Sequence, residues 1–345
     1  MSTKKFLPWV EKYRPTNPDE IVHHQSIVTM MVSMLRKGQM PNILMYGPCG
    51  TGKTSAVWAS IKEVYGKTQE QTRFWIKKIT TGEKPDDEAI GGIRAFCHMA
   101  PPTESHLPKV IVLDEIDNST LEFQQRLCMA MDENNKYARF ILICNNRHQL
   151  AHALTGRCLN LRVPPLSNES IEDRLNLVIR SEWSNNDTIN VSNTVDGIRW
   201  SGWGSHHGDM RHHINMLQSL YHSRLTPCSR SLEQLSGKPS KEKTMEFLTE
   251  IASQPTSAHA IVKGREWMRH HSEFAVTDLL ECCTAALSNI MSCETAVSLD
   301  ELAQTLSKNN NRYTYRTSLV NYLILLLYRE KDSIFIVCSK DKNLS

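Results

Sequence analysis

An octapeptide near the N-terminus has the residue types and spacing of a phosphate-binding loop. Residues 47–54 fit the pattern G-x-x-x-x-G-K-[ST] at every fixed position. In such a loop the glycines let backbone N–H groups turn inward around a phosphate, Lys53 reaches the β- and γ-phosphates, and Thr54 offers a hydroxyl to Mg²⁺. The candidate nucleotide ligands are Gly47, Pro48, Cys49, Gly50, Thr51, Gly52, Lys53 and Thr54.

A strand and a helix are needed to hold this loop, and the flanking sequence can supply both. Residues 42–46 form a short apolar run typical of a buried strand, and residues 55–65 can continue as a helix. The helix N-terminus would add partial positive charge beside the phosphate. The alternative, a turn with a chance lysine, does not explain these flanks.

A second apolar run ends in two carboxylates. Residues 109–113 are followed by Asp114 and Glu115. Open α/β sheets bind ligands beyond the carboxyl ends of their strands, where Lys53 and Thr54 would also lie. Asp114 would then hold Mg²⁺, usually through water, and Glu115 would polarise the attacking water. An Asp-Glu pair after a strand is common by itself, but together with the phosphate loop it predicts nucleotide hydrolysis.

A third apolar run, residues 138–144, ends at Asn145. The amide of this residue could hydrogen-bond the attacking water or the γ-phosphate from the next strand. Asparagine also favours turns, so as a loop residue alone Asn145 would be unremarkable.

The segment 9–15 reads Trp-Val-Glu-Lys-Tyr-Arg-Pro and is expected to be non-helical, because Pro15 fixes the backbone. It could cover a flat ligand or dock as an N-terminal arm. With the phosphate loop, it resembles the N-terminal box of the small subunits of replication factor C, the AAA+ clamp loader of archaea and eukaryotes. The resemblance implies that the arm and the segment after it lie against the adenine of ATP, through Val10, Tyr13, Arg14, Ile21 and Val22.

The same resemblance gives roles to four further residues. Asn145 matches the sensor-1 position of AAA+ proteins, and Arg211, within residues 208–211, matches sensor 2 over the phosphates. Arg157 lies in Gly-Arg-Cys, similar to the family's Ser-Arg-Cys box, and would stabilise the transferred phosphoryl group of a neighbouring subunit's nucleotide. Arg94 matches an arginine that faces the DNA backbone. Without the resemblance, Arg157 would be a surface arginine that caps a helix, and Arg94 a solvated one.

Two segments depart from the family pattern. Residues 80–83 differ from the usual Asn-Ala-Ser-Asp-type stretch. Cys128 and Met129 stand where family members commonly carry paired arginines, within a helix expected over residues 121–132. Met129 is therefore expected to serve in packing, and any basic contact from this helix is in doubt.

Histidine pairs at 206–207 and 212–213 raise the question of a metal site. Adjacent histidines cannot share one helical face, and no acidic or cysteine ligand has a suitable spacing. The sequence therefore favours ordinary helix residues here.

The remaining pattern predicts an α/β core followed by helices. The expected elements are a strand at 73–79, a helix at 87–99 interrupted at Gly91-Gly92, helices at 170–182 and 208–221, a polar loop at 183–193, a linker at 227–243 and only helices from 244 onward. The resemblance implies a parallel AAA+ P-loop NTPase core over residues 1–164, a small helical lid over 165–226 and an all-helical oligomerisation collar over 240–345.

Composition sets wider bounds. The chain has 345 residues, 40% of them hydrophobic, and a net charge of only +3, so a nucleic-acid surface would depend on local clustering. Its ten cysteines form no C-x-x-C pair, and residues 1–8 contain no apolar signal region, which favours a reducing, intracellular setting. The aliphatic run at residues 322–328 is too short to span a bilayer and is expected to be a core helix.

The motifs and the family resemblance together imply an ATPase subunit of a replication-factor-C-like clamp loader, with ATP and Mg²⁺ as cofactors. The implied partners are large and small loader subunits in a pentameric ring, a PCNA-type sliding clamp and primer-template DNA, with no membrane. The implied location is the site of DNA replication, nuclear in a eukaryotic cell. Two alternatives remain open: another AAA+ DNA motor, such as a branch-migration helicase, or a structural loader subunit that binds ATP without hydrolysis.

Overall fold

The computed structural model describes most of the chain and divides it into two compact units. One unit comprises residues 1–171 with 208–211, and the other comprises 172–207 with 212–345. The described residues are 7–21, 24–66, 73–81, 86–99, 107–183, 191–201, 208–223, 229–287, 295, 297–299, 301–302, 313–332 and 334–335. Within them, every strand belongs to the first unit.

A five-stranded parallel sheet, in the order β2-β3-β4-β1-β5, forms the centre of the first unit. Its strands are β1 (Ile43–Tyr46), β2 (Ile76–Thr80), β3 (Lys109–Asp114), β4 (Ala138–Cys144) and β5 (Leu159–Arg162). The predicted parallel α/β core is confirmed. The second strand begins later than expected, because residues 73–75 form a turn. Since β3, β4 and β1 are neighbours, the three predicted polar strand ends meet at one edge of the sheet.

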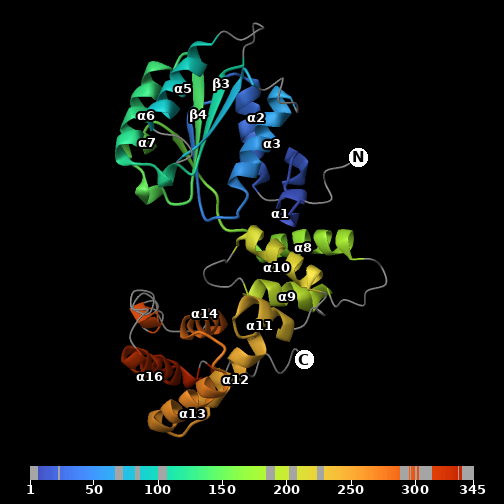
Figure 1. Ribbon diagram of the computed structural model, residues 1–345, viewed down its shortest axis with the longest axis vertical. Coiled ribbons are helices and arrows are strands. Elements are labelled where there is room, and N and C mark those ends of the chain that lie inside the picture. Colours follow the sequence, from blue (N-terminus) through green and yellow to red (C-terminus); the bar gives the residue numbers. More distant parts are fainter. Residues whose placement is uncertain are drawn as a thin grey trace. The chain divides into compact units, whose positions relative to one another are not determined.

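Helices cover both faces of this sheet (Figure 1). The helices are α2 (Gln25–Arg36) and α3 (Lys53–Tyr65) on one face, and α5 (Asp86–His98), α6 (Leu121–Glu133) and α7 (His152–Thr155) on the other. Successive side chains of a strand point to opposite faces. Val110 and Val112 of β3 accordingly pack in the core beneath α2 and α3, whereas Ile111 and Leu113 pack in the core with α5, α6 and α7. Burial on both faces explains the continuous apolar strand sequences.

Three expectations for the first unit were wrong. Residues 9–12 form a short helix, α1 (Trp9–Lys12), because the Trp9 side chain is buried and packs edge-on against Tyr13, while Pro15 lies beyond the helix. Helix α5 continues through Gly91-Gly92. Two helical glycines cost about 1 kcal/mol each relative to alanine, and the buried side chains on either side of them hold the helix on the sheet. Met129 is 58% exposed and does not pack in the interior.

The described part of the second unit is helical. Its helices are α8 (Asn168–Glu182, whose first residues belong to the first unit), α9 (Val191–Ser201), α10 (Met210–His222, which begins in the first unit), α11 (Ser229–Ser236), α12 (Lys241–Ala252), α13 (Ser257–His270), α14 (Val276–Leu287) and α16 (Tyr313–Arg329). Helix α9 begins inside the expected polar loop, whose residues 184–190 lie outside the described residues. The run 322–328 lies in α16 and contributes Leu323, Ile324 and Leu327 to a core with α12, α13 and α14. No described helix is both long and apolar enough to cross a membrane.

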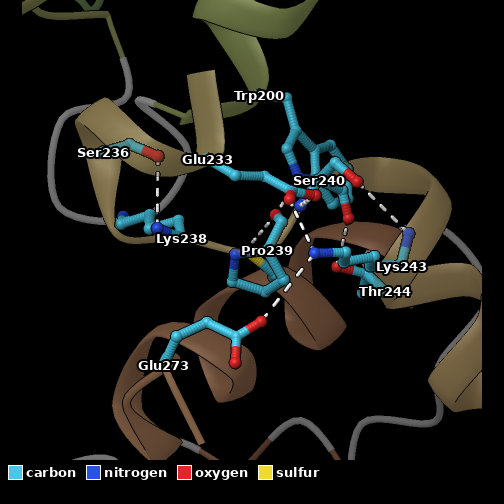
Figure 2. Close-up of polar contacts among 10 residues, drawn as sticks. Trp200, Glu233, Ser236, Lys238, Pro239, Ser240, Lys243, Thr244 and Glu273 are labelled. Atoms are coloured by element: carbon cyan, nitrogen blue, oxygen red, sulfur yellow. Dashed lines mark hydrogen bonds and ion pairs between the residues drawn. The ribbon is translucent and has the colours of Figure 1, made fainter. Parts of the chain in front are cut away.

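The predicted linker at 227–243 was wrong for its described part, which is a hydrogen-bonded junction between α11 and α12 (Figure 2). The Glu233 carboxylate accepts hydrogen bonds from the Ser240 N–H at 3.1 Å and the Lys243 Nζ at 2.7 Å. Trp200 Nε1 donates to the Pro239 carbonyl at 3.0 Å. Burial raises the pKa of Glu233, but these hydrogen bonds outweigh burial and leave it below its usual value. The polar residues of this segment therefore form hydrogen bonds within the protein and do not make a solvated linker.

Candidate nucleotide-binding site

The phosphate loop follows β1 and leads into α3, and two of its glycines are required by close packing. Gly47 has φ +154°, and a Cβ there would lie 2.0 Å from the Val163 carbonyl oxygen. Gly50 has φ +66°, and a Cβ there would lie 1.7 Å from Asp209 Oδ1. Because neither position has room for a side chain and both have positive φ, only glycine fits without displacing the chain around the loop.

Lys53 is folded into the loop. Its Nζ donates to the carbonyl oxygens of Gly47 at 2.8 Å and Pro48 at 2.6 Å, and to Asn145 Oδ1 at 2.9 Å. Lysine has three N–H donors, so these three acceptors satisfy it. The side chain is 6% exposed, and burial lowers the pKa of its ammonium. Two residues predicted to meet at a γ-phosphate are thus in direct contact.

Thr54 and Asp114 form a second contact at the same edge of the sheet. Thr54 Oγ1 lies 3.2 Å from Asp114 Oδ2. A hydroxyl and a carboxylate are the oxygen donors that Mg²⁺ accepts, and the ion usually keeps several waters and binds phosphate oxygens as well. These residues therefore fit a Mg²⁺ that is shared with a nucleotide. Within the described residues no group of three or more His, Cys, Asp or Glu could hold a metal by itself; His206 and His207 lie outside them.

Glu115 has an unusual backbone conformation. It is exposed, and its φ of 57° lies in the left-handed region that non-glycine residues seldom adopt. The Thr81 hydroxyl lies 2.7 Å from the Asp114 carbonyl oxygen and 2.6 Å from that of Glu115, which holds this turn. Strain of this kind tends to occur at functional sites. Thr81 belongs to the segment that departs from the family pattern, and residues 82–83 of that segment lie outside the described residues.

The sequence did not reveal the role of Asp117. Its Oδ2 accepts hydrogen bonds from the backbone N–H groups of Asn145 at 2.9 Å and Asn146 at 3.0 Å. One carboxylate therefore fixes the turn that presents Asn145 to Lys53. In the sequence, Asp117 is recognisable only as the last residue of Asp114-Glu115-Ile116-Asp117. The groups that it binds become visible in the structure, because β3 and β4 are neighbours in the sheet.

Residues 208–211 lie against the phosphate loop. Cys49 Sγ donates to Asp209 Oδ2 at 3.3 Å, and the Met210 N–H donates to the Gly50 carbonyl at 3.3 Å. Asp209 Oδ1 also accepts a hydrogen bond from the Arg211 N–H at 2.9 Å, which caps the first turn of α10. The segment predicted to carry sensor 2 is thus placed beside the loop, and Asp209 is a contact that sequence reasoning missed.

The N-terminal arm reaches the helix that follows the loop. Arg14 Nε donates to Ser55 Oγ at 3.3 Å. Ile21 is buried in a cluster with Ala56 and Ala59 of α3. Val10 and Tyr13 are half-buried, and Val22 lies outside the described residues. The arm is therefore docked on α3, and its place against adenine stays a prediction.

The two remaining predicted arginines bind α6 instead of the phosphate loop. Arg157 pairs with Asp132, with Nη2 to Oδ2 at 2.8 Å, and Arg94 pairs with Glu133, with Nε to Oε2 at 3.0 Å. Neither hydrogen-bonds the loop within the described residues. For Arg157 this agrees with a role outside its own nucleotide site.

Comparison with known proteins places the chain in a family. The model of the AAA family, "ATPase family associated with various cellular activities", matches residues 43–165. "Probable replication factor C subunit 5" of Caenorhabditis elegans is 31% identical over 263 residues, which are 74% of this chain and 69% of that protein. The chain belongs to the replication factor C family. "Replication factor C subunit 3" of Schizosaccharomyces pombe is 32% identical over 224 residues, or 64% of this chain, and the match spans 61% of that relative's length.

A solved structure shares the fold of this replication factor C homologue. "Structure of the Aeropyrum pernix ORC1 protein in complex with DNA" matches with a TM-score of 0.50, covering 94% of this chain and 97% of that chain. Its sequence identity is 15%, so the likeness concerns the fold alone.

Proposed function

We propose that this chain is an ATPase subunit of a replication-factor-C-type clamp loader, which uses ATP to place a PCNA-type ring on primer-template DNA. The observation that carries the proposal is the pair of contacts Lys53–Asn145 and Thr54–Asp114. These contacts bring together, at the ends of three adjacent parallel strands, the residues that we propose bind phosphate, sense it and hold magnesium, in a chain of this family.

In the proposed mechanism the phosphate loop binds the ATP phosphates, and Lys53 exchanges its loop carbonyls for phosphate oxygens. Mg²⁺, when bound, would neutralise phosphate charge, with Thr54 and Asp114 as its protein ligands. Glu115 orients and polarises the attacking water, while Asn145 fixes the geometry of water or γ-phosphate. The parallel strands β3, β4 and β1 hold the backbone positions from which these groups would act.

Two arginines complete the proposed site. Arg211 lies in the segment that contacts the phosphate loop and would bind the phosphates of its own subunit. Arg157 would act on the nucleotide of a neighbouring subunit, where a permanently charged, planar guanidinium stabilises the transferred phosphoryl group. The arm residues Val10, Tyr13, Arg14, Ile21 and Val22 would cover the adenine.

The division into a nucleotide-binding domain at 1–164, a lid at 165–226 and an oligomerisation collar at 240–345 belongs to the same proposal. Large and small loader subunits in a five-membered ring, a sliding clamp and DNA are its partners, at the site of DNA replication. Arg94 pairs with Glu133 through Nε and Nη2, and its other N–H groups would be the ones to contact DNA. Met129 and the buried Cys128 supply no basic group to help it.

Glu115→Gln tests the proposal in the complex purified with this chain. The amide keeps the shape of the side chain but polarises water poorly, so Mg·ATP should still bind while steady-state ATP turnover falls at least about 100-fold. Glu122→Gln, an exposed carboxylate on α6, is the control and should retain turnover.

The composition and activity of that complex complete the test. A larger subunit and a ring clamp should copurify, and DNA should stimulate hydrolysis. A closed hexamer that unwinds duplex DNA, or binding without turnover in every assembly, would contradict the proposal.

A further inference from the structure

Asp132 holds the guanidinium of Arg157 from one side. Arg157 Nε lies 3.0 Å from Asp132 Oδ1, and Nη2 lies 2.8 Å from Oδ2, so both carboxylate oxygens are used. The third nitrogen, Nη1, donates to the carbonyl of Ala153 on α7 at 2.8 Å. Two elements, α6 and α7, therefore fix the plane of this arginine.

This arrangement leaves two N–H groups of the guanidinium available. Arginine has five N–H groups, and the bonds to Asp132 and Ala153 use three of them. Within the described residues, one N–H on each terminal nitrogen has no hydrogen bond, and both can donate to phosphate oxygens. The Arg157 side chain is 38% exposed, so a second molecule can approach it.

The pair is poorly suited to a purely stabilising role. The Asp132 side chain is 59% exposed, and exposed ion pairs contribute little to stability. An unpaired surface arginine, in contrast, samples many rotamers, and fixing it beforehand removes that entropic cost from the step that needs it. The hydrogen bond from Arg157 also lowers the pKa of Asp132.

We propose that Asp132 is a positioning residue, which holds Arg157 so that its two remaining N–H groups face the nucleotide of an adjacent subunit. This inference rests on the proposed function of Arg157 as a residue acting in trans. Asp132 would not touch the nucleotide. Its removal should leave ATP binding intact and reduce the rate of hydrolysis, because small misplacements of a charge-stabilising group are costly in the transition state.

The test uses the complex purified with this chain and measures kcat and KM for ATP. Arg157→Ala should lower kcat most, and Asp132→Ala should lower it roughly tenfold with KM unchanged. The double variant should be no slower than Arg157→Ala alone, because Asp132 acts only through Arg157. Asp132→Glu, which keeps the carboxylate, should retain more activity than Asp132→Asn, whose amide can turn an N–H toward the arginine.

Glu133→Ala is the matched control. Glu133 is the next residue of α6, is 48% exposed and binds Arg94 through two hydrogen bonds, at 3.0 and 3.2 Å. Its removal breaks an ion pair of the same kind on the same helix. Turnover measured without DNA should remain at the level of the unmodified complex.

The outcomes separate the two proposals. If Arg157→Ala leaves turnover unchanged, the role of Arg157 in trans fails, and the inference fails with it. If Arg157→Ala slows hydrolysis while Asp132→Ala does not, only the positioning role is wrong. Faster turnover in Asp132→Ala, or losses that multiply in the double variant, would also overturn it. Should Asp132→Ala fail to assemble, Asp132→Asn, which preserves the shape of the side chain, is measured in its place.

Discussion

Lys53 in the phosphate loop and Lys238 in the α11–α12 junction are both buried, with exposed fractions of 6% and 9%. Lys238 pairs with the Glu281 carboxylate at 2.7 Å, so its charge is compensated inside the protein. Lys53 hydrogen-bonds two loop carbonyls and an amide oxygen, and among the described residues none of its hydrogen-bond partners is an anion.

This difference distinguishes the candidate binding site from the structural junction. Burying a cation without an anion costs free energy, and burial lowers the pKa of Lys53 accordingly. A phosphate would supply the missing negative charge and accept the same hydrogen bonds. Burial of a lysine without an anionic hydrogen-bond partner does not by itself mark a functional site, since buried Lys109 also bonds only backbone carbonyl oxygens among the described residues. The phosphate-loop motif and the contact with Asn145 distinguish Lys53 from it.

Replacing each lysine with alanine should give the largest difference between the two regions. Lys53→Ala should weaken ATP binding roughly 100-fold, because two or more charged hydrogen bonds to phosphate are lost. Lys238→Ala should lower stability and leave ATP affinity unchanged. Titration with a fluorescent ATP analogue and thermal unfolding of both variants measure the two effects. Unchanged ATP affinity in folded Lys53→Ala would contradict the assignment of the phosphate loop.

A smaller effect is expected from Glu233, the carboxylate that joins α11 to α12. Glu233→Gln should lower the free energy of unfolding by about 1–3 kcal/mol at pH 7, since it weakens charged hydrogen bonds from Lys243 and Ser240. Urea unfolding measures it. Glu242→Gln, on the exposed face of α12, is the control, with an expected change within about 0.5 kcal/mol.

The pH dependence of the Glu233 effect has a definite sign. Hydrogen bonds hold the pKa of Glu233 below its usual value despite burial. A carboxylate with a lowered folded-state pKa stabilises the protein above its unfolded-state pKa, and this contribution is lost as pH falls through the folded-state value. The difference between the unmodified chain and Glu233→Gln should therefore shrink on acidification from pH 7 to about pH 3. A constant difference would show that the charge is not responsible.

The two regions also differ in how well the sequence predicted them. The phosphate loop and strands β3 and β4 were predictable because glycine spacing and apolar runs are local signals. The junction was taken for a linker because its Ser, Gly and Lys residues resemble solvated chain. Their partners, such as Glu233 for Lys243 and Glu281 for Lys238, become visible only after the helices have packed.

The same limit applies within the candidate site. Lys53, Thr54, Asp114 and Asn145 could be grouped because parallel strands end at one edge. Asp209 could not, since it lies 160 positions from Cys49 and its contact with the loop depends on the tertiary fold. Helix α1 was missed because the burial of Trp9 decided its conformation.

The smallest predicted effect concerns Cys49, through which the phosphate loop meets Asp209. Cys49 is exposed, but partial desolvation and the hydrogen bond to Asp209 raise the pKa of its thiol, so less of it is the reactive thiolate at pH 8. Asp209→Asn removes the negative charge, and its side-chain oxygen can still accept the hydrogen bond from the Arg211 N–H that caps α10. The pKa of Cys49 should therefore fall, and its alkylation by iodoacetamide should become a few-fold faster, measured by mass spectrometry of the Cys49 peptide. Buried Cys283 is the internal control and should stay unreactive in both proteins. If Asp209→Asn slows the alkylation of Cys49, the carboxylate does not suppress the thiolate, and its contact with the phosphate loop is one of packing alone.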